Sequence, residues 1–182
     1  MSRYPLADIN ALPDDIKAKV LEVQSKAGFV PNVFLGLARR PAEWRAFFAY
    51  HDALMEPESV GRTSNLSKGD REMIVTTTSA ANQCLYCVAD QVAVNYRKAT
   101  DITPRQRAML DFAMKVCERS HEISEDDFAP LHAHGFDDED IWDIAAITAF
   151  FGLSNRIASF SGMQPNPEFY LMGRVPREKK PA

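Results

Sequence analysis

IWDIAAITAFFGLSNRIASF, residues 141–160, is the most apolar stretch of the chain and predicts a long helix at the centre of the core. Asp137 stands just before it, as an N-cap residue should. Apolar residues occur on nearly all sides of this helix, which is typical of a helix with neighbours around it. We therefore expect Trp142 to lie in the core, together with Ile141, Ile144 and Ile147.

Helical spacing and capping signals also dominate the rest of the chain, and no strand-like alternation or repeat is present. Further helices are expected to begin near Pro13, Val33, Pro41, Ser67, Asn82, Thr103 and Ser124, with Asn82 as an N-cap. The fold class predicted is an all-α helical bundle, a single domain over residues 1–182. Residues 1–40 hold its N-terminal helices, and residues 163–182 form an extended C-terminal tail. In that tail, Pro165 and Pro167 argue against regular helix, and the aromatic residues after them are expected to dock onto the body or a neighbouring subunit.

Composition and charge argue against several classes of function. The formal net charge of −4 provides no basic surface for a nucleic-acid backbone. No stretch approaches the roughly 18 uninterrupted apolar residues that a membrane span needs. The first residues, Met1 to Pro5, lack the apolar region of a signal peptide, so a cytoplasmic protein is expected.

The motif that carries chemistry is Cys84-Leu85-Tyr86-Cys87. Disulfide frameworks are rare in a reducing compartment, so a close pair of cysteines there indicates redox catalysis or metal binding. At the start of a helix, the exposed N–H groups and the macrodipole favour the reactive thiolate. One thiol can then be oxidised to a sulfenic acid, which the other converts to a disulfide.

Three alternatives to this chemistry remain. In the first alternative, the two cysteines form half of a zinc site. The sequence has no second Cys-x-x-Cys pair, so only Cys117 with His132 or His134 could complete such a site. The cysteines can also be structural and buried in a core helix. A thioredoxin-type site requires a βαβ context, which the sequence lacks.

Glu72 is the second candidate residue. If its helix and the Cys84 helix form an antiparallel hairpin, Glu72 and position 91 lie roughly 12–13 Å from the turn, and Cys87 about one turn of helix nearer to it. A carboxylate there is suited to controlling a proton carrier at position 91 that serves Cys87. The alternative is a surface salt bridge between Glu72 and a residue such as Lys68 or Arg71.

Taken together, these segments resemble the alkylhydroperoxidase D / carboxymuconolactone decarboxylase family, whose signature is Glu…Cys-x-x-Cys-x-x-x-His. The resemblance is to its branch of uncharacterised peroxidase-related enzymes and covers nearly the whole chain. The segments that carry it are Glu72, Cys84–Cys87, Pro31-Asn32-Val33-Phe34, Ser79-Ala80-Ala81-Asn82, residues 140–146 (DIWDIAA) and residues 165–170 (PNPEFY).

The resemblance implies a role for each site residue. Cys87 would attack the peroxide, Cys84 would resolve the disulfide, and Glu72 would polarise the family's histidine. It also implies a helical homo-oligomer, a small hydroperoxide substrate and a thiol or disulfide reductant protein of unknown identity. Neither haem nor flavin is needed, and no cofactor or metal is expected.

The chain departs from the family where the histidine should stand. Four residues after Cys87 it has Gln91, whose neutral amide cannot accept a proton near pH 7. We hypothesise that a segment with the histidine is absent between Val88 and Ala89, either deleted or missing from the printed sequence. An intact mass of 20.4 kDa would show a deletion.

The other candidates are more ordinary. His51 can lie near the thiols, but a satisfied core or surface histidine is the simpler interpretation. His121, His132 and His134 flank acidic loops and are expected to be exposed, and Cys117 is expected to be a small buried residue. Three functions stay open: a thiol peroxidase, a decarboxylase-like enzyme that does not use thiols, and a redox-sensing or structural oligomer without turnover.

Overall fold

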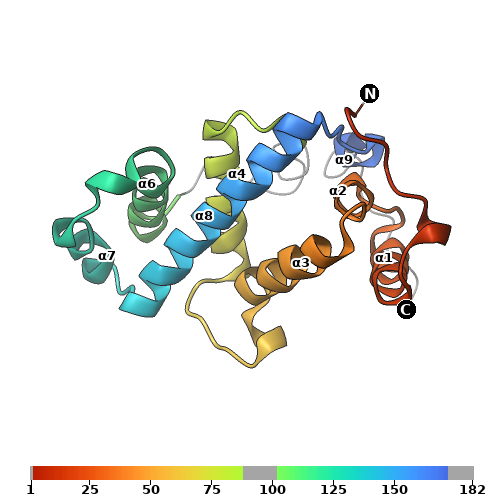
Figure 1. Ribbon diagram of the computed structural model, residues 1–182. Coiled ribbons are helices and arrows are strands. Elements are labelled where there is room, and N and C mark those ends of the chain that lie inside the picture. The colour runs from red at the N-terminus through yellow and green to blue at the C-terminus, as the bar shows by residue number, and fades with distance from the viewer. Residues whose placement is uncertain (1, 88–101, 172–182) are drawn as a thin grey trace.

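The computed structural model describes residues 2–87 and 102–171, and no strand occurs within these ranges (Figure 1). The predicted all-α fold class is therefore confirmed. The helices are α1 Asp14–Ala27, α2 Asn32–Leu37, α3 Pro41–Met55, α4 Lys68–Ala81, α6 Pro104–Arg119, α7 Ala129–Ala133, α8 Asp138–Ser161 and α9 Pro167–Leu171. Short 3₁₀ turns occupy Ile9–Ala11, Pro57–Val60, Ser120–Glu122 and Glu125–Asp127.

The predicted capping residues set most helix ends. Ser67 begins α4 and Asp137 begins α8, and each forms a capping box with the acidic residue three positions later. Such boxes satisfy two backbone N–H groups that have no partner within the helix. Gly28 ends α1 in the left-handed region at φ 88°.

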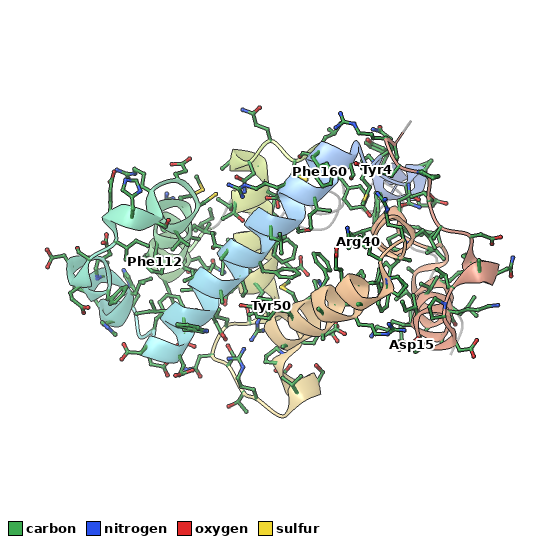
Figure 2. The ribbon with its side chains drawn as sticks, in the orientation of Figure 1. Tyr4, Asp15, Arg40, Tyr50, Phe112 and Phe160 are labelled. Carbon is green, nitrogen blue, oxygen red and sulfur yellow. The ribbon has the colours of Figure 1, made fainter. Side chains whose placement is uncertain are left out.

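The long α8 crosses the middle of the molecule and organises the packing (Figure 1). It lies against α4, α6 and α3, and Ile144 and Ile147 are fully buried among them. A second core joins α1, α2 and α3 around Val20 and Phe48. The N-terminal segment lies against the far end of α8, where Tyr4 meets Phe160 edge-on at 6.1 Å between ring centroids (Figure 2).

The loop between α3 and α4 is bound to two buried carboxylates of α8. Asp143 accepts hydrogen bonds from Arg62 Nη1 at 3.0 Å and from Ser64 Oγ at 2.8 Å. Asp140 accepts one from Asn65 Nδ2 at 3.2 Å. The loop is thereby held in one place above the start of α4.

The predicted tail contains a short helix, so the expectation of an irregular, extended segment is wrong for α9. Pro167 starts this helix, where its missing N–H is not needed. Asn166 accepts a hydrogen bond from the backbone N–H of Asn32 and donates one to the carbonyl of Val30. Phe169 is consequently buried within the body, as one of the two alternatives expected.

Two side chains predicted to be buried are not. Trp142 is 70% exposed, because the 100° step from Ile141 turns it away from the core. Cys117 is half-buried, and its thiol donates a hydrogen bond to Asn82 Oδ1 at 3.7 Å. Within the described ranges, no helix has the length and apolar character needed to cross a membrane.

Candidate active site

A tight turn connects α4 to the thiol pair. Asn82 ends α4, because its backbone N–H still bonds to the carbonyl of Thr78. The prediction that Asn82 starts the next helix is therefore wrong. Gln83 follows in the left-handed region at φ 52°, and the N–H of Cys84 bonds to the carbonyl of Ser79.

Cys84 itself occupies the capping position before helical residues 85–87. Its Sγ accepts a hydrogen bond from the backbone N–H of Cys87 at 3.4 Å. A thiol at this position lies at the positive end of the helical turn, which favours its thiolate form.

The surroundings of Cys84 make it an acidic thiol. Its pKa is lowered from 9.0 to about 7, first by a hydrogen bond from the Cys87 thiol, and against the opposing effect of burial. The backbone N–H of Cys87 and the side chains of Ser159 and Asn155 lower this pKa further. The thiolate of Cys84 is therefore far easier to form near neutral pH than that of an ordinary cysteine.

Behind Cys84 lies a buried polar network that the sequence reasoning did not identify. Asn155 of α8, only 1% exposed, donates a hydrogen bond to Ser79 Oγ at 3.0 Å. It accepts another from Asn82 Nδ2 at 2.9 Å. The network fixes the turn between α4 and the thiols to the central helix.

Cys87 faces a cavity of about 490 Å³, which we call the thiol cavity. Cys84 is not part of its lining, so Cys87 is the thiol that a small substrate can reach. Most of the wall is apolar and aromatic: Pro31, Val33, Phe34, Phe47, Phe48, Met55, Val75, Phe150, Phe151 and Phe169. Its titratable residues besides Cys87 are His51, Glu56, Lys68, Glu72 and Tyr86.

The structure thus brings Glu72 and Cys87 to one cavity, although they lie on different elements. Glu72 is half-buried on α4. The proton-carrier position, Gln91, and the join between Val88 and Ala89 fall outside the described residues. The predicted relay through position 91 therefore stays a prediction.

A histidine from another element also lines this cavity. His51 of α3 lies with Nδ1 at 3.0 Å from Asp52 Oδ1, while Lys19 pairs with the other oxygen of Asp52. The hydrogen bond from His51 lowers the pKa of Asp52, so the carboxylate stays ionised and fixes Nδ1 as the donor. Nε2 is then the ring nitrogen left for the cavity. Of the two interpretations of His51, the structure agrees with the one that places it near the thiols, and the other three histidines are exposed as predicted.

Tyr86 connects the site to the N-terminal helices and to α9. Its Oη accepts a hydrogen bond from the backbone N–H of Val33 at 3.1 Å, and its ring meets Phe169 edge-on.

Across the described ranges, no three His, Cys, Asp or Glu side chains gather as a metal site would require.

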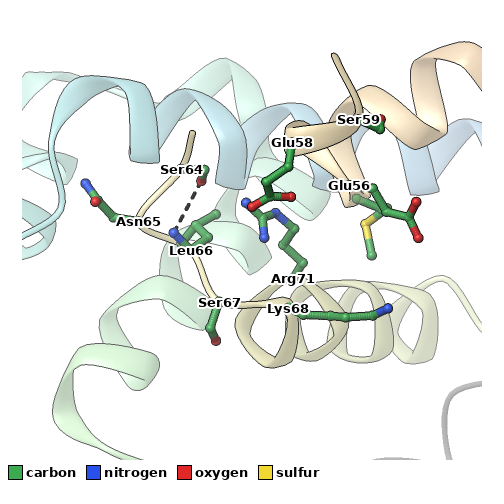
Figure 3. Close-up of a pocket in the computed structure, with 10 residues that line it drawn as sticks. Glu56, Glu58, Ser59, Ser64, Asn65, Leu66, Ser67, Lys68 and Arg71 are labelled. Atoms are coloured by element: carbon green, nitrogen blue, oxygen red, sulfur yellow. Dashed lines mark hydrogen bonds between the residues drawn. The ribbon is translucent and has the colours of Figure 1, made fainter. Parts of the chain in front are cut away.

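A second cavity, of about 560 Å³, adjoins the thiol cavity, and we call it the Arg71 cavity (Figure 3). Met55, Glu56 and Lys68 line both cavities. Arg71 is only 3% exposed, yet its Nε and Nη2 have no hydrogen-bond partner among the described residues. The sequence had indicated Arg71 only as a salt-bridge partner for Glu72.

The chain is similar in sequence and fold to several known proteins. Residues 41–101 match the model of the carboxymuconolactone decarboxylase family. The chain is 64% identical to the alkylhydroperoxidase AhpD core, uncharacterized peroxidase-related protein from Ralstonia eutropha JMP134, over 97% of this chain and 98% of that one, with a TM-score of 0.87. It is 38% identical to an uncharacterized peroxidase-related protein from Silicibacter sp. TM1040, over 93% and 94% of the two chains, with a TM-score of 0.81.

A more distant solved structure shares the fold alone. The debrominase Bmp8 is 19% identical, over 93% of this chain and 95% of that one, with a TM-score of 0.72. No curated protein matches the sequence.

Proposed function

Because the chain belongs to the carboxymuconolactone decarboxylase family, in its alkylhydroperoxidase AhpD-like group, we propose that it is a thiol-dependent peroxidase. It would reduce hydroperoxides through a dithiol–disulfide cycle of Cys84 and Cys87. The observation that carries the proposal is the pairing of an acidic capping thiol, Cys84, with a second thiol that lines a cavity of small-molecule size. The peroxidase-related relatives support the reaction class.

In the first step, the Cys87 thiolate attacks the outer oxygen of the hydroperoxide. A sulfur–oxygen bond forms, the O–O bond breaks, and the alkoxide leaves with the electron pair. The sulfur is oxidised to a sulfenic acid and the hydroperoxide is reduced to an alcohol. One proton must leave the thiol and one must reach the alkoxide, so the step needs a proton carrier.

We assign this carrier to His51, with Asp52 as its positioning residue. His51 lines the same cavity as Cys87, and its Nε2 is free of the Asp52 hydrogen bond. The ring would take the proton of the Cys87 thiol and return it to the departing alkoxide. Glu72, on another wall of the cavity, would act on this ring as the second carboxylate of the site.

In the second step, the Cys84 thiolate attacks the sulfenic sulfur of Cys87. A disulfide forms, and hydroxide leaves and takes up a proton as water. The low pKa of Cys84 suits this step, because the attacking sulfur must be a thiolate at neutral pH. A thiol or disulfide reductant protein would then return both cysteines to thiols.

Turnover of the Cys87→Ser variant tests the proposal most directly. We expect hydroperoxide consumption with a dithiol reductant to fall to background, because a hydroxyl is too weak a nucleophile for this step. Cys117→Ser is the matched control, since Cys117 lines neither cavity and should keep wild-type turnover. Equal turnover in wild type and Cys87→Ser would contradict the proposal.

Activity assays on the cysteine variants also distinguish the peroxidase from two other functions. An enzyme of the decarboxylase type would keep its activity on a small lactone or acid after loss of both cysteines. A redox sensor would show reversible formation of the Cys84–Cys87 disulfide, but no hydroperoxide consumption with any reductant.

A further inference from the structure

The Arg71 cavity holds a buried cation that has no counter-ion within residues 2–87 and 102–171. Arg71 rises from the first turns of α4, and its guanidinium points across the cavity toward the Glu58 side chain (Figure 3). Two of its three nitrogens are out of contact with solvent and without a hydrogen-bond partner among the described residues. Burial of an unpaired charge is unfavourable, so the site favours an anion that pairs with it.

The carboxylates nearest to this cation do not supply that pair. Glu56 and Glu58 line the cavity but are exposed, and neither forms an ion pair with Arg71. Water screens exposed carboxylates strongly, whereas the buried guanidinium is screened far less. Lys68, also on the rim, adds a second positive charge. Asp70, next in sequence, instead pairs with Arg105 and Gln106 of α6.

The contents of the two cavities complement each other. The Arg71 cavity offers a guanidinium, which binds a carboxylate through two parallel hydrogen bonds. The thiol cavity, which shares Met55, Glu56 and Lys68 with it, offers an aromatic wall suited to hydrocarbon. A molecule with an acidic head and an apolar body would satisfy both.

We propose that Arg71 binds the carboxylate of an amphipathic substrate whose apolar body lies in the thiol cavity. The substrate class is therefore organic hydroperoxides that carry a carboxylate, rather than hydrogen peroxide. The binding site stands on Arg71 alone, whereas the reaction rests on the proposed function.

Binding is tested first with an unreactive probe. Octanoate should raise the melting temperature of the reduced wild-type protein, whereas 1-octanol at the same concentration should not. In Arg71→Met, we expect the dissociation constant for octanoate to rise at least tenfold. Arg107→Gln is the matched control, because this exposed arginine of α6 lines neither cavity and its loss changes the net charge equally.

An equal shift in wild type and Arg71→Met would overturn the proposal. Removal of an unpaired buried charge should leave Arg71→Met at least as stable as wild type without ligand. Arg71→Lys gives a second test of the same point, since it keeps the charge but loses the two parallel bonds and should weaken octanoate binding in part. A smaller oligomer for either variant in light scattering would mean that a neighbouring subunit satisfies Arg71, which also overturns the proposal.

Alkylation of Cys87 by iodoacetamide tests the link between the cavities without any turnover. Octanoate should slow the modification of Cys87 in wild type, but not in Arg71→Met. Octanoate that binds without protecting Cys87 would show a separate anion site and would overturn the substrate class.

Kinetics test the reaction itself. The ratio of kcat/KM for a carboxylate-bearing hydroperoxide to that for cumene hydroperoxide should fall about tenfold in Arg71→Met. No turnover with either hydroperoxide, together with Arg71-dependent octanoate binding, would reject the peroxidase and keep the carboxylate site.

Discussion

Cys84 and Cys87 differ in their surroundings, and this difference divides the proposed chemistry between them. Cys84 lies behind the cavity wall, where it receives hydrogen bonds from the thiol and N–H of Cys87 and from Asn155 and Ser159. These donors favour its thiolate but leave it out of reach of a substrate. Cys87 lines the cavity, where a small substrate can reach it. The more acidic thiol, Cys84, is therefore suited to resolve the disulfide. The more accessible thiol, Cys87, is suited to attack the substrate.

The acidity of Cys84 can be measured by the ultraviolet absorbance of thiolate in the reduced protein. We expect one titration with a midpoint of about 7, and in Cys87→Ala a midpoint shifted toward 9.0, since the largest cause of the low pKa is removed. Cys87→Ser, which keeps a hydroxyl donor, should shift less. A wild-type protein without a titration near 7 would contradict this assignment.

The same pKa makes a prediction for stability. The folded pKa of Cys84 lies below its unfolded value, so between about pH 7 and 9 the unfolded chain binds more protons. The free energy of unfolding of the reduced protein should therefore gain a contribution that is absent below pH 7 and complete above pH 9. Urea unfolding of wild type and Cys84→Ala across this range measures it, because the variant lacks the contribution.

The proposed role of His51 as proton carrier can be tested by substitution. His51→Asn should lower turnover by about 10²-fold, the lower end of the effect of a lost general acid–base group. His132→Asn, at an exposed histidine outside both cavities, is the control, and wild-type turnover in His51→Asn would contradict the role.

Helices show how far local sequence signals reach. The starts of α4, α6 and α8 were predictable because Ser67, Thr103 and Asp137 cap them with side chains three residues from their partners. Asn82 misled the prediction, since its side chain is used by Asn155, from a helix 73 positions away. Asn155 and Arg71 could not be identified from the sequence either, because their importance comes from burial and from neighbours that only the fold supplies. The thiol pair and Glu72 could be identified because their family signature is a local spacing.

The attachment of the α3–α4 loop to α8 is testable at the level of elements. Asp143→Asn removes the charge that binds Arg62 and Ser64, and we expect the free energy of unfolding to fall by about 2–3 kcal/mol. Asp111→Asn, at an exposed position of α6, loses the same charge and should change it little. Equal urea midpoints for the two variants would show that the loop contacts contribute nothing.

On the scale of the whole molecule, α8 exposes an apolar stripe that the described part of the chain covers only at its end, where Tyr4 meets Phe160. Trp142, Leu153 and Phe160 are each more than half exposed, and Ala146 and Ala149 lie between them at spacings of three and four residues. A helix that is apolar on both faces is usually buried on both. Sequence periodicity alone cannot tell burial within a chain from burial between chains, which is why Trp142 was assigned to the core.

We propose that this stripe is the interface of a homo-oligomer, since large exposed apolar patches mark protein interfaces. Leu153→Glu should then lower the mass measured by light scattering toward that of one 20.4 kDa chain, because a carboxylate placed in a dry interface costs several kcal/mol. Val60→Glu is the matched control, as Val60 is equally exposed but lies on the turn after α3, away from the stripe. The fluorescence of Trp142 should shift to longer wavelength in Leu153→Glu as water reaches the indole. A wild-type protein that is already a monomer, or a Leu153→Glu variant with unchanged mass, would reject the interface and leave the exposed stripe for another partner.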